Sequence, residues 1–330
     1  MNNNIIKFES VSEIQNSLHS IAIEAGFEMI GFTEARISEK DQTNIQSFID
    51  NNYYGSMKWF PERQNIRLRF ENLGFPIASC IVLGMVYKPS EESVKSCEVI
   101  LDSISKYAWG QDYHQVLKDK AKPILEFLRS QFPNYKFRQA VDSLPIPEKI
   151  LARDAGLGWI GKHTILINSN YGSYFFLTVI LSEKVLHLID TEKIAFKMPS
   201  KDRCGTCTAC IDACPTNAIV NAYELDSNLC ISHNTIELKD PSFDEATKNH
   251  GWVYGCDICQ DVCPWNKTVA RKKNIHSKIE EFKPIKFFSE SSEIFHELDE
   301  QDFEHVFKDS AILRIGYKNW NRNIQQKDTF

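Results

Sequence analysis

The sequence has no apolar segment long enough to cross a membrane. A transmembrane helix needs roughly 20 consecutive apolar residues, whereas the longest apolar runs of this 330-residue chain lie around 76–87 and 174–181, and we interpret both as buried strands. Residues 1–10 are polar and contain no apolar signal segment. These absences argue against a membrane protein and predict a cytoplasmic location, where cysteines stay reduced and disulfides are not expected.

An excess of positive charge is also missing. Lys and Arg number 38 against 44 Asp and Glu, which gives a net charge of −6 and no global attraction for a polyanion such as nucleic acid. A polyanion would therefore have to bind a local basic patch, although a solvated charged face is the commoner explanation of such a cluster. The candidate patches are Lys267, Arg271, Lys272, Lys273 and Lys278, and, nearer the end of the chain, Arg314, Lys318 and Arg322.

The chain does contain ten cysteines, and eight of them belong to two runs. The first run reads C-x-x-C-x-x-C-x-x-x-C-P from Cys204 to Pro215, and the second places Cys230 ahead of C-x-x-C-x-x-x-C-P from Cys256 to Pro264. This spacing resembles that of bacterial ferredoxins with two clusters, in which the Cys before Pro binds the other cluster. We therefore expect two [4Fe-4S] clusters, one held by Cys204, Cys207, Cys210 and Cys263, and the other by Cys214, Cys230, Cys256 and Cys259.

Two structural zinc sites are the alternative, because paired C-x-x-C motifs also bind zinc. A three-residue gap followed by Pro, present in both runs, has no role in a tetrahedral zinc site, and this favours the clusters. The other two cysteines lack ligand spacing. We expect Cys80 to be a buried free thiol in an apolar strand, and Cys97, on a polar segment, to be exposed.

Helix and strand patterns alternate up to about residue 195, which predicts an α/β or α+β domain. A capping box at 10–13 begins a helix that Gly26 ends, and a strand is expected at 27–33. The further elements expected are a helix around 45–49, a strand over 77–87, a helix over 115–130 with a kink at Pro123, and strands at 136–142, 164–168 and 174–181.

A glycine-rich turn, residues 155–162, contains the pattern G-x-G-x-x-G at Gly156, Gly158 and Gly161. A dinucleotide-binding loop follows a strand and opens a helix. Here a helical segment precedes the turn and a strand follows it, so the context is inverted and argues against a dinucleotide site. We expect instead that the backbone passes close to a flat cofactor or to a neighbouring domain.

Further motifs occur in order along the chain: YAWGQDYH at 107–114, VDS at 141–143, AGLGWIGKH at 155–163, GSYFF at 172–176, CIS at 230–232, TIE at 235–237, YGCD at 254–257, CPWN at 263–266 and RIG at 314–316. Together with the cysteine runs, they resemble the epoxyqueuosine reductase family, cobalamin-dependent iron–sulfur enzymes that complete queuosine in tRNA. The resemblance spans nearly the whole chain and is far more specific than the ferredoxin spacing alone.

The resemblance implies an α+β protein with three parts. These are an N-terminal α/β cobalamin-binding catalytic domain (1–195), a bacterial ferredoxin-like domain with two [4Fe-4S] clusters (196–275), and a C-terminal helical segment that packs on the core (276–330). Many family members continue into a longer helical extension, whereas this chain stops at Phe330. We expect a monomer that receives electrons from a low-potential donor.

The implied reaction reduces epoxyqueuosine to queuosine in the anticodon wobble position of tRNA. Cob(I)alamin would attack the epoxide with electrons delivered singly by the clusters, and Asp142 would protonate the oxygen, its pKa raised by burial beside the corrin. Ser105 stands where some members have a cysteine. The cobalamin contacts expected by position are Arg67, Ser105, Asp142, Gly158, Lys162, His163, Ser173 and Tyr174.

Residues 112–117 begin like the D-x-H-x-x-G motif of proteins that bind cobalt through His, but the final Gly is missing, so we interpret His114 as structural. The tRNA phosphates are expected to contact Lys239, Lys267, Arg271, Lys272 and Lys273, with the modified base flipped into the cobalamin pocket. Two other classes stay open. One is a reductive dehalogenase-like enzyme, although such proteins usually carry an export signal, and the other is a simple ferredoxin-type electron carrier.

Overall fold

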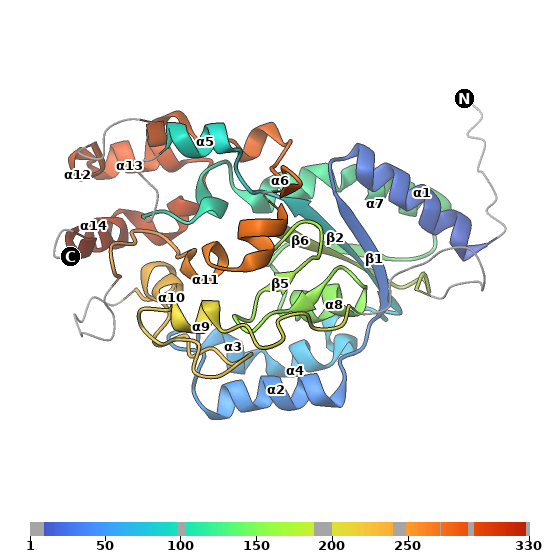
Figure 1. Ribbon diagram of the computed structural model, residues 1–330. Helices are drawn as coiled ribbons and strands as arrows, with labels where there is room; N and C mark the ends of the chain where they lie inside the picture. Colours follow the sequence, from blue (N-terminus) through green and yellow to red (C-terminus); the bar gives the residue numbers. More distant parts are fainter. Residues whose placement is uncertain are drawn as a thin grey trace.

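The computed structural model describes residues 10–97, 103–187, 200–239, 249–270, 272–289 and 294–327. Within these ranges, the centre of the fold is an antiparallel sheet with the strand order β1-β2-β6-β3 (Figure 1). The strands span Met29–Glu34 (β1), Ser79–Val86 (β2), Phe137–Ala140 (β3) and Phe175–Ser182 (β6). This sheet and its helices confirm the predicted α+β class. No helix of the described residues is long and apolar enough to cross a membrane.

The strand β2 lies inside the sheet and is buried along its whole length. Its side chains alternate between two cores on opposite faces of the sheet, with Ile81, Leu83 and Met85 on one face and Cys80, Val82 and Val86 on the other. β6 pairs with all of β2 and is almost as deeply buried. Because both faces of these strands are covered, they appear in the sequence as continuous apolar runs.

Helices cover both faces of the sheet (Figure 1). α1 (Val11–Glu24), α6 (Tyr113–Lys120) and α7 (Lys122–Gln131) contribute to the core on the Ile81 face, and α8 (Glu148–Asp154) contributes to the core on the Cys80 face. As predicted, Ser10 caps α1 by accepting a hydrogen bond from the Glu13 N–H.

The single kinked helix expected over 115–130 is wrong. The chain forms two helices, α6 and α7, with Ala121 between them. Pro123 stands in the first turn of α7, where its missing N–H leaves no helical hydrogen bond unmade. Pro123 therefore begins a helix instead of bending one.

Three helices and a 3₁₀ helix connect β1 to β2 and lie beyond α8 (Figure 1). They are α2 (Glu39–Asp50), α3 (Trp59–Glu62), α4 (Gln64–Leu68) and η1 (Phe70–Leu73). Arg153 of α8 holds α2 through two hydrogen bonds, 2.9 and 2.8 Å, to the buried carboxylate of Asp41. After α8, the strands β4 (Trp159–Ile160) and β5 (Leu166–Ile167) form a small hairpin.

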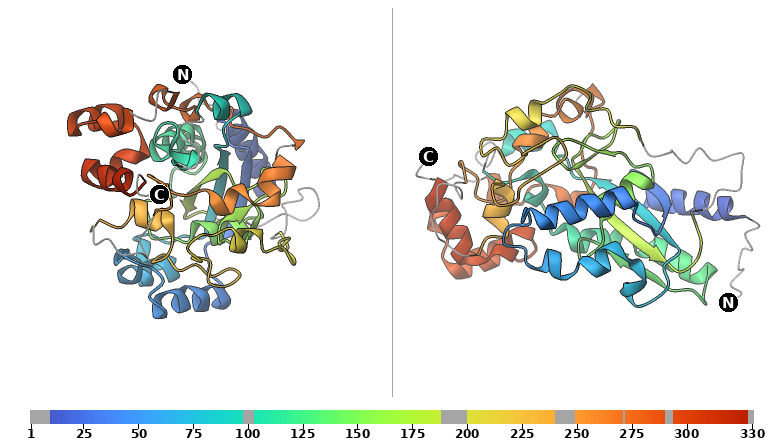
Figure 2. Two further views of the ribbon diagram at one scale, coloured as in Figure 1. Left: turned by 60° about the vertical axis from the view of Figure 1, so that its left-hand side comes forward. Right: turned by 90° about the horizontal axis from the view of Figure 1, so that it is seen from below.

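The cysteine runs lie on short elements: α9 (Ala209–Asp212), α10 (Ile231–Ile236), α11 (Ile258–Asp261) and the π-helical η5 (Trp265–Ala270). A third core joins the C-terminal part of the chain to the region of Cys97 (Figures 1 and 2). Its elements are α5 (Glu91–Ser96), η3 (Lys106–Ala108), η7 (Lys286–Ser289), α12 (Ile294–Glu297), α13 (Glu300–Phe307), η8 (Ala311–Ile315) and α14 (Gly316–Lys327), and Ile236 of α10 also contributes. The 3₁₀ helix η6 (Glu280–Phe282) packs instead on the core of the Ile81 face.

The expectation that Cys97 is exposed is wrong, since only 1% of its surface is accessible. Cys97 belongs to the third core, together with C-terminal residues such as Phe287 and Trp320. The polar character of the neighbouring residues gave no sign of this cover, because it comes from a segment about 200 residues away in the sequence. Cys80 is fully buried, as predicted.

Candidate functional site

The eight cysteines of the two runs form two groups of thiols. In the first group, burial raises the pKa of Cys210 to about 11, and the thiols of Cys263, Cys204 and Cys207 add to the rise. In the second group, burial raises the pKa of Cys256, and Cys230 and Cys214 add to it. Burial likewise raises the pKa of Cys259, with contributions from Cys256 and Cys230 of its own group and from Cys210 of the first. The two groups are therefore neighbours.

Backbone N–H groups are directed at several of these thiols. Ile258 donates to Cys256, Ser232 and His233 donate to Cys230, and Trp265 and Asn266 donate to Cys263. Such donors stabilise a thiolate over a thiol. Four thiolates surrounded by amide donors are the ligand set of a [4Fe-4S] cubane. Within the described ranges, no three His, Cys, Asp or Glu side chains form a site for a single metal ion.

The glycine-rich turn covers the first thiol group. Lys162 Nζ donates to the carbonyl oxygens of Gly205 (2.7 Å) and Cys207 (2.9 Å). The buried ring of Trp159 packs with Ile167 and Cys263, and Cys204 and Trp265 lie against the same cluster. This turn thus connects the sheet domain to the first cysteine loop.

Position 158 must be glycine because its backbone lies directly against the opposite strand of the β4–β5 hairpin. A Cβ at this position would lie 2.1 Å from the carbonyl oxygen of Ile167 on β5. Gly161 is less restricted, since its Cβ would first meet Cδ1 of the Ile167 side chain at 2.6 Å. The close backbone approach expected at this turn therefore occurs within the hairpin itself.

Asp142 follows β3 in a left-handed conformation, with φ of 48°. Tyr113 Oη donates to its carboxylate over 3.1 Å, and the backbone N–H of Asp142 donates to Glu148 Oε1 over 2.9 Å. Burial raises the pKa of Glu148 well above its ordinary value, and the charge of Asp142 adds to the rise. The Asp142 side chain itself is exposed, so the protein alone does not provide the burial that the family resemblance implied.

Tyr113 belongs to a group of phenols and aromatic rings beside Asp142. Its ring stacks on Phe176 at 4.4 Å and on His114 at 4.0 Å between centroids, and Tyr107 meets its edge. Burial raises the pKa values of Tyr107 and Tyr113, and that of Tyr254 to about 12, so all three phenols remain protonated at neutral pH. Tyr113 is therefore a permanent hydrogen-bond donor to Asp142.

His114 has a structural role in this group. Its backbone N–H and its ring Nδ1 both bond Asp112 Oδ1, at 2.9 and 2.7 Å, where Asp112 caps α6. The position of His114 is thus explained by the helix cap, in agreement with our interpretation of the sequence.

His163 has a buried nitrogen without a hydrogen-bond partner. Its Nδ1 accepts from the Ile165 N–H over 3.1 Å, whereas its Nε2 is buried and unpaired. Burial lowers the pKa of His163 to about 4, and the charge of Lys149 contributes. The ring is therefore neutral at pH 7 and, with Nδ1 accepting, carries its proton on Nε2.

Three other predicted cofactor residues lie at the contact between the sheet domain and the second cysteine run. Ser105 donates to Asp257 (2.6 Å), Ser173 to Gln260 (2.9 Å) and Tyr174 to Asp261 (2.5 Å). The three hydroxyl groups therefore donate their hydrogen bonds to other residues of the protein. The sequence does not reveal these partners, because the spacing of the cysteines carries no information on what the residues between them contact.

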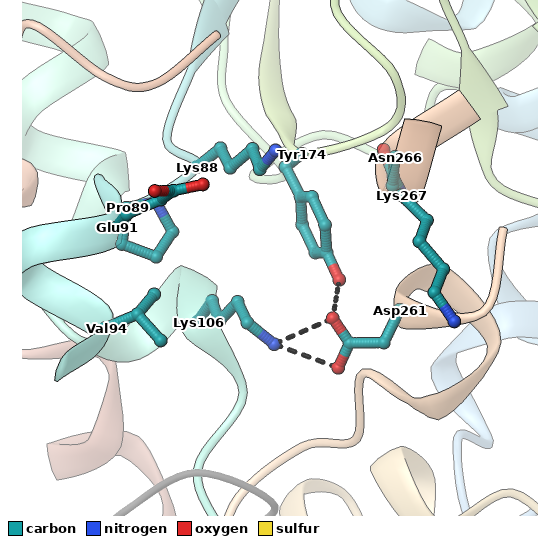
Figure 3. Close-up of a pocket in the computed structure, with 9 residues that line it drawn as sticks. All are labelled: Lys88, Pro89, Glu91, Val94, Lys106, Tyr174, Asp261, Asn266 and Lys267. Atoms are coloured by element: carbon teal, nitrogen blue, oxygen red, sulfur yellow. Dashed lines mark hydrogen bonds and ion pairs between the residues drawn. The ribbon is translucent and has the colours of Figure 1, made fainter. Parts of the chain in front are cut away.

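A pocket of about 240 Å³ opens beside this contact (Figure 3). Lys106 Nζ donates to both carboxylate oxygens of Asp261, each at 2.9 Å, and the Tyr174 hydroxyl donates to the same carboxylate (Figure 3). Burial alone would lower the pKa of Lys106, but Asp257 and Asp261 raise it above its ordinary value. The lysine therefore remains charged and holds the two parts of the chain together.

Arg67, the remaining cobalamin candidate, is held by its own surroundings. Its guanidinium donates to the Phe60 carbonyl over 2.6 Å and lies 3.7 Å from the centroid of the Phe60 ring. Burial, with the charge of Arg63, lowers its pKa to about 10. The structure thus places Arg67 on α4, apart from the contact made by Ser105, Ser173 and Tyr174.

Four of the five residues expected at tRNA phosphates, Lys239, Lys267, Lys272 and Lys273, are exposed. Arg271 lies outside the described residues. In the other basic cluster, Arg314 pairs with Glu237 at 2.6 Å, and the buried Arg322 donates to the carbonyls of Leu238 and Asn234. Arg322 therefore has a structural role in that cluster.

Comparison with known proteins identifies similar sequences over almost the whole chain. Residues 203–266 match the family described as "4Fe-4S double cluster binding domain", and residues 67–143 match "Epoxyqueuosine reductase QueG, DUF1730". The epoxyqueuosine reductase of Leadbetterella byssophila is 40% identical over 316 residues, covering 94% of this chain and 97% of the relative. The epoxyqueuosine reductase of Escherichia coli is 35% identical over 319 residues, covering 95% of this chain and 80% of the relative.

Solved structures agree with this similarity. A selenomethionine-labelled epoxyqueuosine reductase superposes with a TM-score of 0.82 at 26% identity, covering 96% of this chain and 82% of the other. An epoxyqueuosine reductase solved with an epoxyqueuosine-modified tRNA-Tyr stem loop gives a TM-score of 0.81 at 26% identity, with coverage of 96% and 81%.

Proposed function

The chain belongs to the epoxyqueuosine reductase family, and on that premise we propose that it reduces epoxyqueuosine to queuosine in the anticodon wobble position of tRNA. The observation that carries the proposal is a pair of adjacent four-thiol groups packed against a sheet domain in which the Asp142 carboxylate is exposed. The relative solved with a modified tRNA stem loop supports tRNA as the substrate.

The electrons pass through two [4Fe-4S] clusters, which the match to a double-cluster domain supports. Cys204, Cys207, Cys210 and Cys263 hold one cluster, and Cys214, Cys230, Cys256 and Cys259 hold the other. Their grouping in space supports this assignment. Clusters deliver electrons singly, whereas opening the epoxide to an alkene and water consumes two electrons and two protons.

Cobalamin is the cofactor that the family implies, and when bound it would supply the nucleophile for epoxide opening. His163 fits such a group, because its buried Nε2–H has no acceptor in the protein and the corrin rim carries amide oxygens. The hydroxyls of Ser105, Ser173 and Tyr174 are bonded to Asp257, Gln260 and Asp261, so these residues would shape the pocket. Arg67, Gly158 and Lys162 are further cobalamin contacts in this proposal.

Asp142 is the proton donor in this proposal. A carboxylic acid donates to the epoxide oxygen as the carbon–oxygen bond breaks, and cofactor and substrate bound over Asp142 would exclude water from its carboxyl group. Tyr113 and Glu148 hold the carboxyl in place through the side chain and the backbone of Asp142. Tyr113 and Glu148 therefore position the carboxyl group that carries the proton.

The remaining parts of the proposal concern the whole protein. The chain divides at about 195 and 275 into a catalytic domain, a ferredoxin-like domain and a C-terminal segment. It acts as a monomer in the cytoplasm and takes electrons from a low-potential donor. Lys239, Lys267, Arg271, Lys272 and Lys273 contact the tRNA backbone.

Anaerobic reconstitution with iron, sulfide and cobalamin tests the cofactors. Cluster absorption together with retained cobalamin is expected, followed by conversion of epoxyqueuosine-containing tRNA when a strong one-electron reductant is added. Asp142→Asn should keep both cofactors and lose most turnover. Clusters without cobalamin would favour an electron carrier, and zinc in the thiol groups would refute the proposal.

A further inference from the structure

The indole nitrogen of Trp159 is a buried donor without a partner of ordinary geometry. Only 2% of the Trp159 side-chain surface is exposed, and its Nε1–H meets no hydrogen-bond acceptor within normal limits. Buried polar atoms of this kind are rare in folded proteins and usually mark an absent group or a functional role. Trp320 offers an internal comparison, because its Nε1 is also buried and unpaired but lies in the third core.

The surroundings of Trp159 are sulfur ligands. Its ring packs with Cys263, and Cys204 lies against the same cluster. The Lys162 backbone N–H and the Trp159 indole N–H both approach the Cys204 sulfur. The indole is thus close enough to the Cys204 sulfur to interact with it, and a thiolate there would be a stronger acceptor than the thiol.

The position of the ring is fixed by its neighbours. Trp159 meets Trp265 edge to face, with centroids 4.9 Å apart and planes at 75°, and it pairs with Ile167 across the β4–β5 hairpin. Lys162, three residues on, places its ammonium on the carbonyls of Gly205 and Cys207. One rigid turn of the sheet domain therefore brings N–H donors and a positive charge to one thiol group only.

Hydrogen bonds to cluster sulfurs stabilise the more negative, reduced state and raise the reduction potential. We propose that Trp159 is a positioning and tuning residue for the cluster at Cys204, Cys207, Cys210 and Cys263, whose Cys204 thiolate accepts a hydrogen bond from the indole Nε1–H. The bond makes this cluster easier to reduce than it would be without the indole. The inference rests on the cluster assignment in the proposed function.

The test compares W159F with W320F in the full chain after anaerobic reconstitution. Both substitutions remove a buried, unpaired indole N–H and keep an aromatic ring. A redox titration followed by electron paramagnetic resonance should show the midpoint potential of one cluster shifted to more negative values in W159F, with the other cluster unchanged. W320F should leave both potentials at wild-type values. Unmoved potentials in W159F, or an equal shift in W320F, would overturn the inference.

A second measurement keeps the test decisive if W159F loses its cluster. Wild-type protein labelled with ¹⁵N in its indoles should show a nitrogen coupling to one reduced cluster, and the coupling should persist in W265F, which removes the neighbouring indole. Absence of that coupling, or its loss in W265F, would overturn the role of Trp159. A protein that forms no [4Fe-4S] cluster would instead refute the proposed function, so the two failures are distinguishable.

Discussion

The carboxylate of Asp142 depends on one phenol for its side-chain position. Tyr113 Oη donates to it over 3.1 Å, and the Tyr113 ring is held between Phe176 and His114. Tyr113→Phe keeps the stacked ring and removes only the hydroxyl. We expect turnover of epoxyqueuosine-containing tRNA to fall about tenfold, which corresponds to a loss of ~1.4 kcal/mol, with cobalamin and iron contents unchanged.

The matched control for this substitution is Tyr135→Phe, which removes a phenol that is 40% exposed. It should leave turnover at the wild-type level. Turnover at the wild-type rate in Tyr113→Phe would show that Tyr113 does not position Asp142.

His163 makes stability depend on pH. Its pKa is lowered from 6.5 to about 4 in the folded chain, so between these values the unfolded state binds a proton that the folded state does not. The free energy of unfolding should therefore fall as the pH is lowered through this window, by up to about 3 kcal/mol. His163→Asn retains an acceptor for the Ile165 N–H and should show a smaller loss over the same range. Equal pH slopes for the two proteins in denaturant titrations would contradict the assignment.

Single residues differ in how far the sequence could predict them. The cysteine groups follow from local spacing, so their arrangement could be anticipated without knowledge of the fold. The hydrogen bond from Tyr113 to Asp142 joins residues 29 positions apart and has no sequence pattern. The burial of Cys97 depends on C-terminal residues packed over it, which a local polarity pattern does not report.

Among the elements, the β4–β5 hairpin tolerates no side chain at Gly158. A Cβ there would lie 2.1 Å from the backbone oxygen of Ile167, whereas a Cβ at Gly161 would meet the end of the flexible Ile167 side chain. We expect Gly158→Ala to destabilise the protein by more than about 2 kcal/mol, and Gly161→Ala by clearly less. Thermal unfolding of the reconstituted proteins measures the difference, and equal stabilities would contradict the close approach.

Elements were predictable where burial produced a simple pattern. β2 and β6 are buried on both faces and appear as long apolar runs, and α1 has a capping box and a terminal glycine. β5 lies within the strand expected at 164–168, whereas β4 has only two residues, too few for a period to be recognised. The break between α6 and α7 was misplaced because Pro suits the first turn of a helix as well as a kink.

At the scale of the whole molecule, the sheet domain and the second cysteine run are joined by buried charges. Lys106 Nζ contacts Asp261 at 2.9 Å and the fully buried Asp257 at 3.5 Å. Such a contact relates two segments about 150 residues apart and could not be predicted from either segment alone. The match of the chain to its relatives over more than nine-tenths of its length was foreseen from the ordered motifs, since these lie in both segments.

The binding of tRNA depends on how charge is distributed over the surface of the protein. With a net charge of −6, the protein as a whole repels a polyanion, so affinity must come from a local patch such as Lys267, Lys272 and Lys273. Each phosphate contact contributes a slope of roughly −0.7 to −0.9 to the logarithm of the binding constant against the logarithm of salt concentration. Replacing these three lysines by glutamine should therefore weaken binding at low salt and flatten the salt dependence by about two units.

Lys40→Gln supplies the control for this experiment. Lys40 is an exposed lysine in the first turn of α2 and is not among the residues expected to contact tRNA. This substitution should leave both the affinity and the salt slope unchanged, because it removes a charge without removing a phosphate contact. Fluorescence anisotropy with an epoxyqueuosine-containing anticodon stem loop over a salt series measures both quantities. A flat salt response of the wild-type protein would contradict phosphate contacts as the source of affinity, since each lysine–phosphate contact releases a counterion. An unchanged slope in the triple variant would place the tRNA on another face.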